Sequence, residues 1–106
     1  MKEGLGRLTA QLYTLRRMSI SVAGALEAGR EPVLEASLVK EVGTVWEQSL
    51  PGVARDLAAF LNTDAENRAD FDQVMQQMTL IAPKLTIQGG TIEILRGIIA
   101  RGLGLR

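Results

Sequence analysis

The sequence predicts an all-α fold, an antiparallel helical bundle of about four helices in a single domain over residues 1–106. Apolar residues recur at intervals of three and four along most of the chain, as they do on one face of a helix. Short connections separate these stretches, so consecutive helices should lie antiparallel. Hydrophobic residues make up 46% of the 106 residues, which allows one small core and is too high for a disordered chain.

The first helix is expected from Lys2 to about Ala28, where Gly29 provides a C-terminal stop. Its apolar positions form a heptad-like seam with one polar member. The seam comprises Leu5, Leu8, Leu12, Leu15, Ser19, Val22 and Leu26. We interpret it as the core face of an intramolecular bundle, with a zipper between copies of the chain as the alternative.

The second helix is expected to begin at Pro32, which suits the first helical position. Its main apolar stripe is Leu34, Leu38, Val42, Val45 and Ser49, with Val39, Trp46, Leu50 and Val53 adjacent. Trp46 is interpreted as a core or interface anchor. At Pro51-Gly52 a new helix capped by Ser49 is possible, but we favour a continuous or closely abutting helical path.

A polar and acidic segment, Asn62 to Asn67, is expected to be a surface loop. Phe71, Val74, Met75 and Met78 then indicate a third helix that ends before Pro83. Its methionines are interpreted as adaptable core side chains.

Gly89 and Gly90 end one segment, and Thr91 is the expected N-cap of a last helix. Its apolar residues are Ile94, Leu95, Ile98, Ile99 and Leu103. Alternation around Gly-Gly also fits a β-hairpin, but a lone two-stranded hairpin is only marginally stable in water. We therefore favour the helix. Its glycine-flanked start leaves backbone amides free for a phosphate.

Composition excludes several classes of function. Twelve acidic and twelve basic residues give zero net charge, which argues against a nucleic-acid-binding protein. The chain has no cysteine and no histidine, so disulfides, thiolate metal sites and Ser-His or Cys-His catalysis are not available, and no metal site is expected. No apolar run approaches the roughly 20 residues of a membrane span, so we expect a cytoplasmic protein.

The last residues, GGTIEILRGIIARGLGLR, resemble the C-terminal signature of the acyl-CoA dehydrogenases, approximately GGTxEIQRxIIAxxxLGL. The matching positions are Gly89, Gly90, Thr91, Glu93, Ile94, Arg96, Ile98, Ile99, Ala100, Leu103, Gly104 and Leu105. The similarity extends upstream to Leu12-Tyr13 and to Glu35-Ala36-Ser37 followed by Lys40. It covers most of the chain and is weakest between Pro51 and Lys84.

This resemblance implies a domain of a flavoenzyme that uses FAD to desaturate acyl-CoA thioesters between the α and β carbons. Family members assemble as dimers or tetramers and have an N-terminal helical domain, a middle β domain and a C-terminal bundle. In many members that bundle begins with one helix more than this sequence shows. The family's catalytic glutamate falls on Gly89 here, and its flavin-contacting Gln-x-x-Gly-Gly segment is replaced by residues 55–59. The resemblance therefore implies no catalytic residue, and Gly90, Thr91 and Glu93 as cofactor-binding residues.

We accordingly expect a C-terminal domain that contributes oligomer contacts and part of a flavin site, is inactive alone and binds no FAD unaided. The alternative is a stand-alone helical module that self-associates as a homodimer. An enzyme that uses Glu27, Glu31 or Glu35 is the least favoured interpretation, since a lone helical glutamate is usually solvated.

Overall fold

Helices form the fold throughout the part of the chain that the computed structural model describes, residues 2–86 and 91–105. They are α1 (Lys2–Glu27), α2 (Val33–Ala58), α3 (Ala65–Ile81), the short 3-10 helix η1 (Ala82–Thr86) and α4 (Ile92–Gly102). Within these residues there are four α-helices and no strand, which confirms the predicted all-α fold. The second arm of the alternative hairpin is helical, so that alternative is wrong.

Glycines in the left-handed conformation end both α1 and α4. Gly29 has φ 75° and Gly104 has φ 81°. At the end of α1, the Arg30 N–H donates to the Ala25 carbonyl and the Gly29 N–H donates to the Leu26 carbonyl, each at 3.0 Å. Such a pair of bonds satisfies the last free carbonyls of a helix. The predicted stop at Gly29 is therefore confirmed.

We expect Gly29→Ala to lower the free energy of unfolding by about 1 kcal/mol, because a Cβ atom disfavours the left-handed conformation. Gly24→Ala is the matched control, since Gly24 is helical and a Cβ there would meet no atom within 4 Å. The control should instead stabilise the protein by about 0.5–1 kcal/mol. Urea denaturation followed by circular dichroism measures both values. A change of the same sign in the two variants would contradict this account of the turn.

The second helix runs without a break through its proline. α2 extends from Val33 to Ala58, with Pro51 buried inside it and Pro32 at the N-cap position. Proline has no amide hydrogen, so one intrahelical bond is missing at Pro51, yet the helix continues. The predicted continuous path is therefore confirmed, and the predicted start of the helix differs by one residue.

The third helix begins directly after Asp64, within the segment that was predicted to be a loop. α3 starts at Ala65, so the loop predicted over Asn62 to Asn67 is shorter than expected. The Asp64 carboxylate accepts hydrogen bonds from the backbone N–H of Asn67 at 2.8 Å and from its side-chain amide at 2.6 Å. These two bonds lower the pKa of Asp64 below its usual value, because they favour the charged carboxylate.

We predict that this cap contributes to the acid sensitivity of α3. A carboxyl group with a lowered folded-state pKa stabilises the fold above its unfolded pKa, and that contribution is lost as the pH falls through the folded value. Asp64→Asn keeps a capping oxygen but does not titrate. Helicity measured from about pH 6 down to pH 2 should therefore fall less steeply in this variant than in the wild type over the range in which Asp64 titrates. Identical curves would show that the cap does not contribute.

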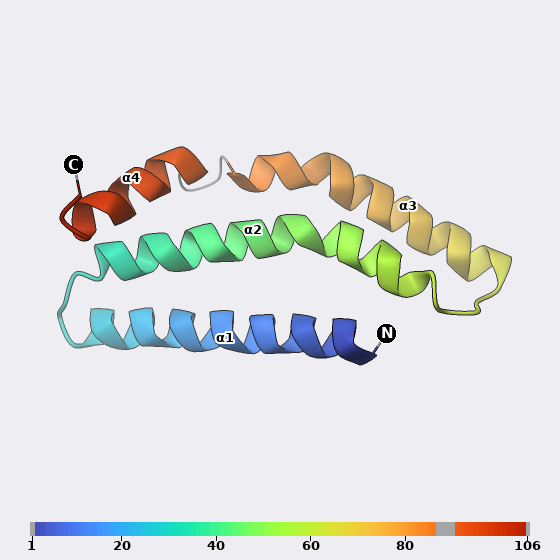
Figure 1. The fold of residues 1–106 in the computed structure, drawn as a ribbon, viewed down its shortest axis with the longest axis horizontal. Helices are drawn as coiled ribbons and strands as arrows, with labels where there is room; N and C mark the ends of the chain where they lie inside the picture. Colours follow the sequence, from blue (N-terminus) through green and yellow to red (C-terminus); the bar gives the residue numbers. More distant parts are fainter. Residues whose placement is uncertain (1, 87–90, 106) are drawn as a thin grey trace.

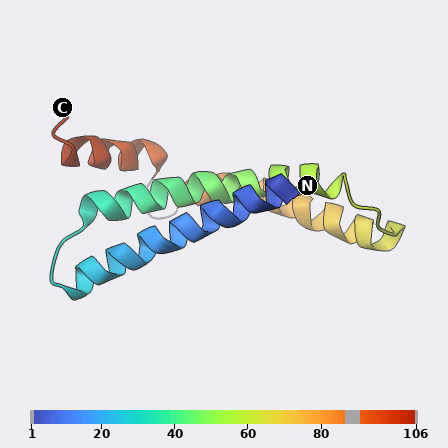
Figure 2. The ribbon, with the colours of Figure 1, turned by 60° about the horizontal axis from the view of Figure 1, so that its bottom comes forward.

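α2 is the central helix of the molecule. α1 lies antiparallel along one side of it, and α3 and α4 follow one another along the other side (Figure 1). Figure 2 shows α1 crossing α2 at an angle, with α4 on the far side of α2. The end of α4 lies close to the start of α2, since a Cβ atom at Gly102 would be 3.0 Å from Leu34 Cδ1.

This layer of helices buries few side chains. The buried hydrophobic residues are Ala25, Ala58, Met75 and Leu95. The accessible surface is 7897 Å², about a third more than a compact monomer of this mass exposes. The radius of gyration is 17.1 Å, against about 13 Å for a compact domain of this length. Much of the apolar surface that a closed bundle would cover is therefore open.

The seam predicted along α1 is only partly covered. Leu8, Leu15 and Val22 are half-buried, whereas Leu5, Leu12 and Leu26 are more than half exposed. The physical reason is that α2 is the helix that packs against α1 in this layer. A single neighbouring helix covers only part of a seam of seven residues.

The stripe predicted along α2 needs a similar correction. Leu38, Val42 and Val45 are 41%, 39% and 48% exposed, while the most buried positions of the helix include Ser37 and Thr44. Because α1 and α4 contact opposite sides of α2 (Figure 1), the stripe between those sides remains uncovered.

Candidate functional site

Thr91, one of the three residues expected to contact a cofactor, caps α4. Its hydroxyl accepts a hydrogen bond from the Ile94 N–H at 3.3 Å, and its backbone is extended. The predicted N-cap is therefore confirmed. Gly90 and the base position Gly89 lie outside the described residues.

Glu93 lies in the first turn of α4, and its side chain is exposed. The amides of Ile92 and Glu93 belong to the same turn, where N–H groups have no partner within the helix. Such a helix start suits a phosphate oxygen. The Glu93 carboxylate does not donate to an anion, but its two oxygens can accept bonds from hydroxyl groups.

A long-range ion pair joins this last helix to the central one. Arg96 Nε of α4 donates to Glu41 Oε1 of α2 at 2.7 Å. The Arg96 side chain is mostly exposed, and that of Glu41 is largely covered. The hydrogen bond to Glu41, with the nearby charges of Glu41 and Glu93, raises the pKa of Arg96. The pair is thus a direct polar link between α4 and α2.

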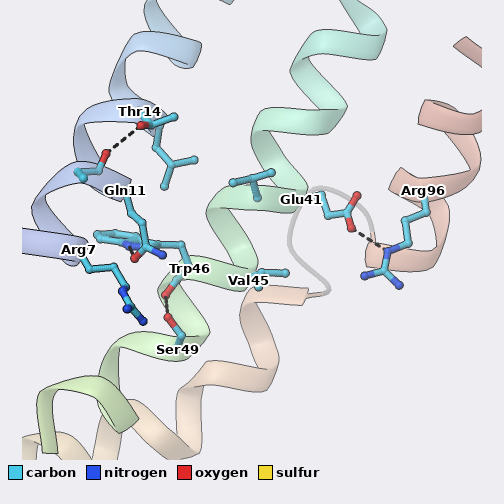
Figure 3. A pocket seen from close by; sticks show the side chains of 11 residues that line it. Arg7, Gln11, Thr14, Glu41, Val45, Trp46, Ser49 and Arg96 are labelled. Carbon is cyan, nitrogen blue, oxygen red and sulfur yellow. Dashed lines mark hydrogen bonds and ion pairs between the residues drawn. The ribbon is translucent and has the colours of Figure 1, made fainter. Parts of the chain in front are cut away.

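A cleft of about 720 Å³ lies between α1 and α2, with Arg96 of α4 at its edge (Figure 3). Its lining residues are Arg7, Ala10, Gln11, Thr14, Leu15, Glu41, Val42, Val45, Trp46, Ser49 and Arg96. Figure 3 shows Trp46 reaching from α2 toward α1, where its Nε1–H donates to Gln11 Oε1 at 3.1 Å. The cleft thus has an apolar floor on α2 and charged groups at its rim.

The polar groups of the cleft are not arranged for covalent catalysis. The Thr14 hydroxyl donates to the Ala10 carbonyl at 2.8 Å, and the Ser49 hydroxyl donates to the Trp46 carbonyl at 2.7 Å. Each hydroxyl is therefore bonded to its own helix and not to a base that could activate it. The arrangement suits non-covalent contact with an apolar surface.

Within residues 2–86 and 91–105, no cluster of three or more histidine, cysteine, aspartate or glutamate side chains could hold a metal ion. In the same part of the chain, none of the helices is both long enough and apolar enough to cross a bilayer.

Sequence reasoning did not single out the cleft or its two long-range bonds. Gln11 and Trp46 are 35 positions apart, and Glu41 and Arg96 are 55 positions apart. No local spacing relates such pairs. For the pair Glu41 and Arg96, opposite charges on two predicted helices are the one signal in the sequence that could have suggested the contact.

Comparison with known proteins identifies one family. Residues 1–104 match the family described as "Acyl-CoA dehydrogenase, C-terminal domain". Comparisons with curated proteins and with solved structures gave no match. The matched region includes all four α-helices, the capped start of α4 and the ion pair that holds it. The chain therefore belongs to the acyl-CoA dehydrogenase family, in the region of the C-terminal domain.

Proposed function

We propose that this chain is the C-terminal helical domain of an acyl-CoA dehydrogenase-like flavoprotein, that it contributes oligomer contacts and one wall of a flavin site, and that it does not catalyse alone. The observation that carries the proposal is the family match over residues 1–104, combined with a glycine, Gly89, where the resemblance places the catalytic base. Glycine has no side chain that could abstract a proton.

The flavin wall would be the start of α4. Backbone amides in the first turn are free to bind phosphate oxygens, and Gly90, just before the cap, allows close approach of a ligand to the backbone. Thr91 holds the turn in shape through its bond to Ile94. Glu93 would accept a bond from a ribose hydroxyl, the role its carboxylate allows.

An activity assay tests the predicted inactivity of the isolated chain. The purified chain is incubated with FAD, an acyl-CoA and an artificial electron acceptor, beside a family enzyme with all three domains as positive control. We expect no turnover by this chain and no retention of FAD after gel filtration. Measurable turnover by the isolated chain would overturn the proposal.

A complementation assay tests the flavin wall. An acyl-CoA dehydrogenase fragment with the N-terminal and middle domains, but without its own C-terminal bundle, is co-expressed with this chain. Retention of FAD by the fragment should rise when the chain is present. Thr91→Ser keeps the capping hydroxyl and should preserve the gain, whereas Thr91→Val removes it and should weaken retention. Equal retention with and without the chain would count against the flavin role.

A second candidate function is a stand-alone module that self-associates. It is favoured by the open apolar surface, which includes Leu5, Leu12 and Leu26 on α1, since large exposed apolar patches generally mark association sites. Light scattering distinguishes the two functions when combined with the complementation assay. A homodimer that does not support FAD retention would favour the module, and a chain that stays monomeric at high concentration would exclude it.

A further inference from the structure

Two side chains of α1 present hydrogen-bond donors to the cleft between α1 and α2. Arg7 and Gln11 both line the cleft, and they are four positions apart, so they are neighbours on one face of the helix. Gln11 accepts a bond from Trp46 Nε1 through its carbonyl oxygen, which leaves its NH2 group as a donor. The ion pairs formed among residues 2–86 and 91–105 do not include Arg7. The guanidinium and the amide can therefore donate to the same ligand group.

The rest of the cleft is mainly apolar. Ala10 and Leu15 of α1 face Val42, Val45 and Trp46 of α2 across it. The two hydroxyl groups of the cleft already donate to carbonyl groups of their own helices. The volume of about 720 Å³ lies within the range of roughly 300–1,000 Å³ that is typical of small-molecule sites. The cleft therefore suits a small molecule with an apolar body and one polar group.

Trp46 gives the cleft an aromatic wall. Its bond to Gln11 at 3.1 Å links the indole to α1, and Figure 3 shows the indole on the Arg7 side of the cleft. Two aromatic rings in offset-stacked or edge-to-face contact gain free energy beyond the burial of area, and a guanidinium stacks well on an aromatic face. A ligand with an aromatic ring is therefore favoured over an aliphatic one of the same size.

The charges of the cleft favour a ligand with a single negative charge. Its charged lining residues are Arg7, Arg96 and Glu41, two cations and one anion, so their net formal charge is +1. Glu41 accepts a bond from Arg96 at 2.7 Å, which leaves Arg7 as the cation for a ligand. One carboxylate neutralises the lining, whereas a second negative charge would be repelled by Glu41.

We propose that the cleft between α1 and α2 binds an aromatic monocarboxylate, with its carboxylate on Arg7 and Gln11 and its ring against Trp46 and Val45. Arginine and a carboxylate can form two parallel hydrogen bonds, which fixes the orientation of the ligand. Binding is non-covalent, and it does not depend on the flavin role proposed for the start of α4.

Titration with β-naphthoate, an aromatic monocarboxylate, tests the ligand class. The chain has a single tryptophan, so the indole N–H of Trp46 gives one signal in a heteronuclear NMR spectrum. This signal should shift and saturate at one ligand per chain. The neutral alcohol β-naphthylmethanol lacks the charge, and decalin carboxylate has the same carbon skeleton without aromatic rings. Each should bind at least about fivefold more weakly than β-naphthoate.

Three results of this titration would overturn the proposal. An indole signal that does not move would show that the cleft does not bind the acid. Equal binding of the alcohol would exclude the carboxylate contact, and equal binding of decalin carboxylate would exclude the preference for a ring. A shift that occurs only where light scattering detects self-association would place the site between copies, and this would overturn the proposal as well.

Charge variants test the two donors. Arg7→Gln removes the cation and should weaken binding of β-naphthoate about fivefold at low salt. Gln11→Glu keeps an acceptor for the Trp46 N–H but replaces the donor with a negative charge, so the loss should be at least about tenfold. Arg17→Gln is the matched control, since Arg17 is exposed and lies about 15 Å from Arg7 along α1. It should bind as the wild type does, and an equal loss in this control would contradict the contact with Arg7.

A steric variant tests the position of the ring without a change in charge. Ala10→Leu places a larger side chain in the cleft and should abolish saturable binding. Ala23→Leu, at an exposed position about 20 Å away on the same helix, should leave binding unchanged. Circular dichroism verifies that each variant is folded. Undiminished binding by Ala10→Leu would exclude the cleft as the site, whereas the complementation assay for FAD retention would be unaffected, so the two proposals fail separately.

Discussion

Leu95→Ala should detach α4 from α2 and lower the free energy of unfolding by about 2–4 kcal/mol. Leu95 is 5% exposed and lies at the contact of α4 with the central helix. Removing its side chain deletes buried methyl groups and leaves a cavity between two helices. Small domains have a total stability of only about 5–15 kcal/mol, so the loss is a large share of it. Urea denaturation followed by circular dichroism measures the change.

The neighbouring residue provides the control. Ile94 has the same number of side-chain carbons but is 57% exposed, so Ile94→Ala should cost less than about 1 kcal/mol. If the two variants lose equal stability, α4 is not held through Leu95, and the packing of α4 described above is wrong.

Thr44→Glu should destabilise the fold at a cost of about 3 kcal/mol. Thr44 is 3% exposed in the middle of α2. A carboxylate there has to lose most of its water, and Arg16 and Lys40, which line the cleft beside Thr44, can offset only part of this cost. We expect the packing around the middle of α2 to loosen. Hydrogen exchange should therefore speed up in α2 and in the helices that pack on it.

Ala36→Glu tests whether this effect comes from burial. Ala36 is on the same helix and exposed, so its replacement adds the same charge in contact with solvent. The change in stability should stay within about 0.5 kcal/mol. A large loss in the control would mean that any added acid destabilises α2, and burial of Thr44 would no longer explain the first result.

Local features of the sequence were sufficient to predict where the helices end. Gly29 stops α1 because it adopts a left-handed conformation that other residues avoid, and Thr91 caps α4 because its hydroxyl reaches an amide three positions later. Both effects involve residues within one turn of each other. The start of α3 was missed by a few residues, since several polar residues there can cap and Asp64 is the one that does.

The candidate site was only partly predictable. Thr91 and Glu93 came from the resemblance, and the structure places both in the first turn of α4. Their role toward a flavin is a proposal. The cleft beside Trp46 was not predicted, because it depends on how α1 lies along α2 and on where Arg96 meets Glu41.

By itself, the sequence determined the helical class, the family and the absence of a side chain at the base position, because spacing, caps and ordered motifs are properties of neighbouring residues. Only the tertiary structure decided which apolar residues are covered. Leu38, Val42 and Val45 have the pattern of a core stripe, yet they are open, since α1 and α4 lie on opposite sides of α2. Periodicity shows that a helix has an apolar face, but coverage of that face depends on where the other helices lie.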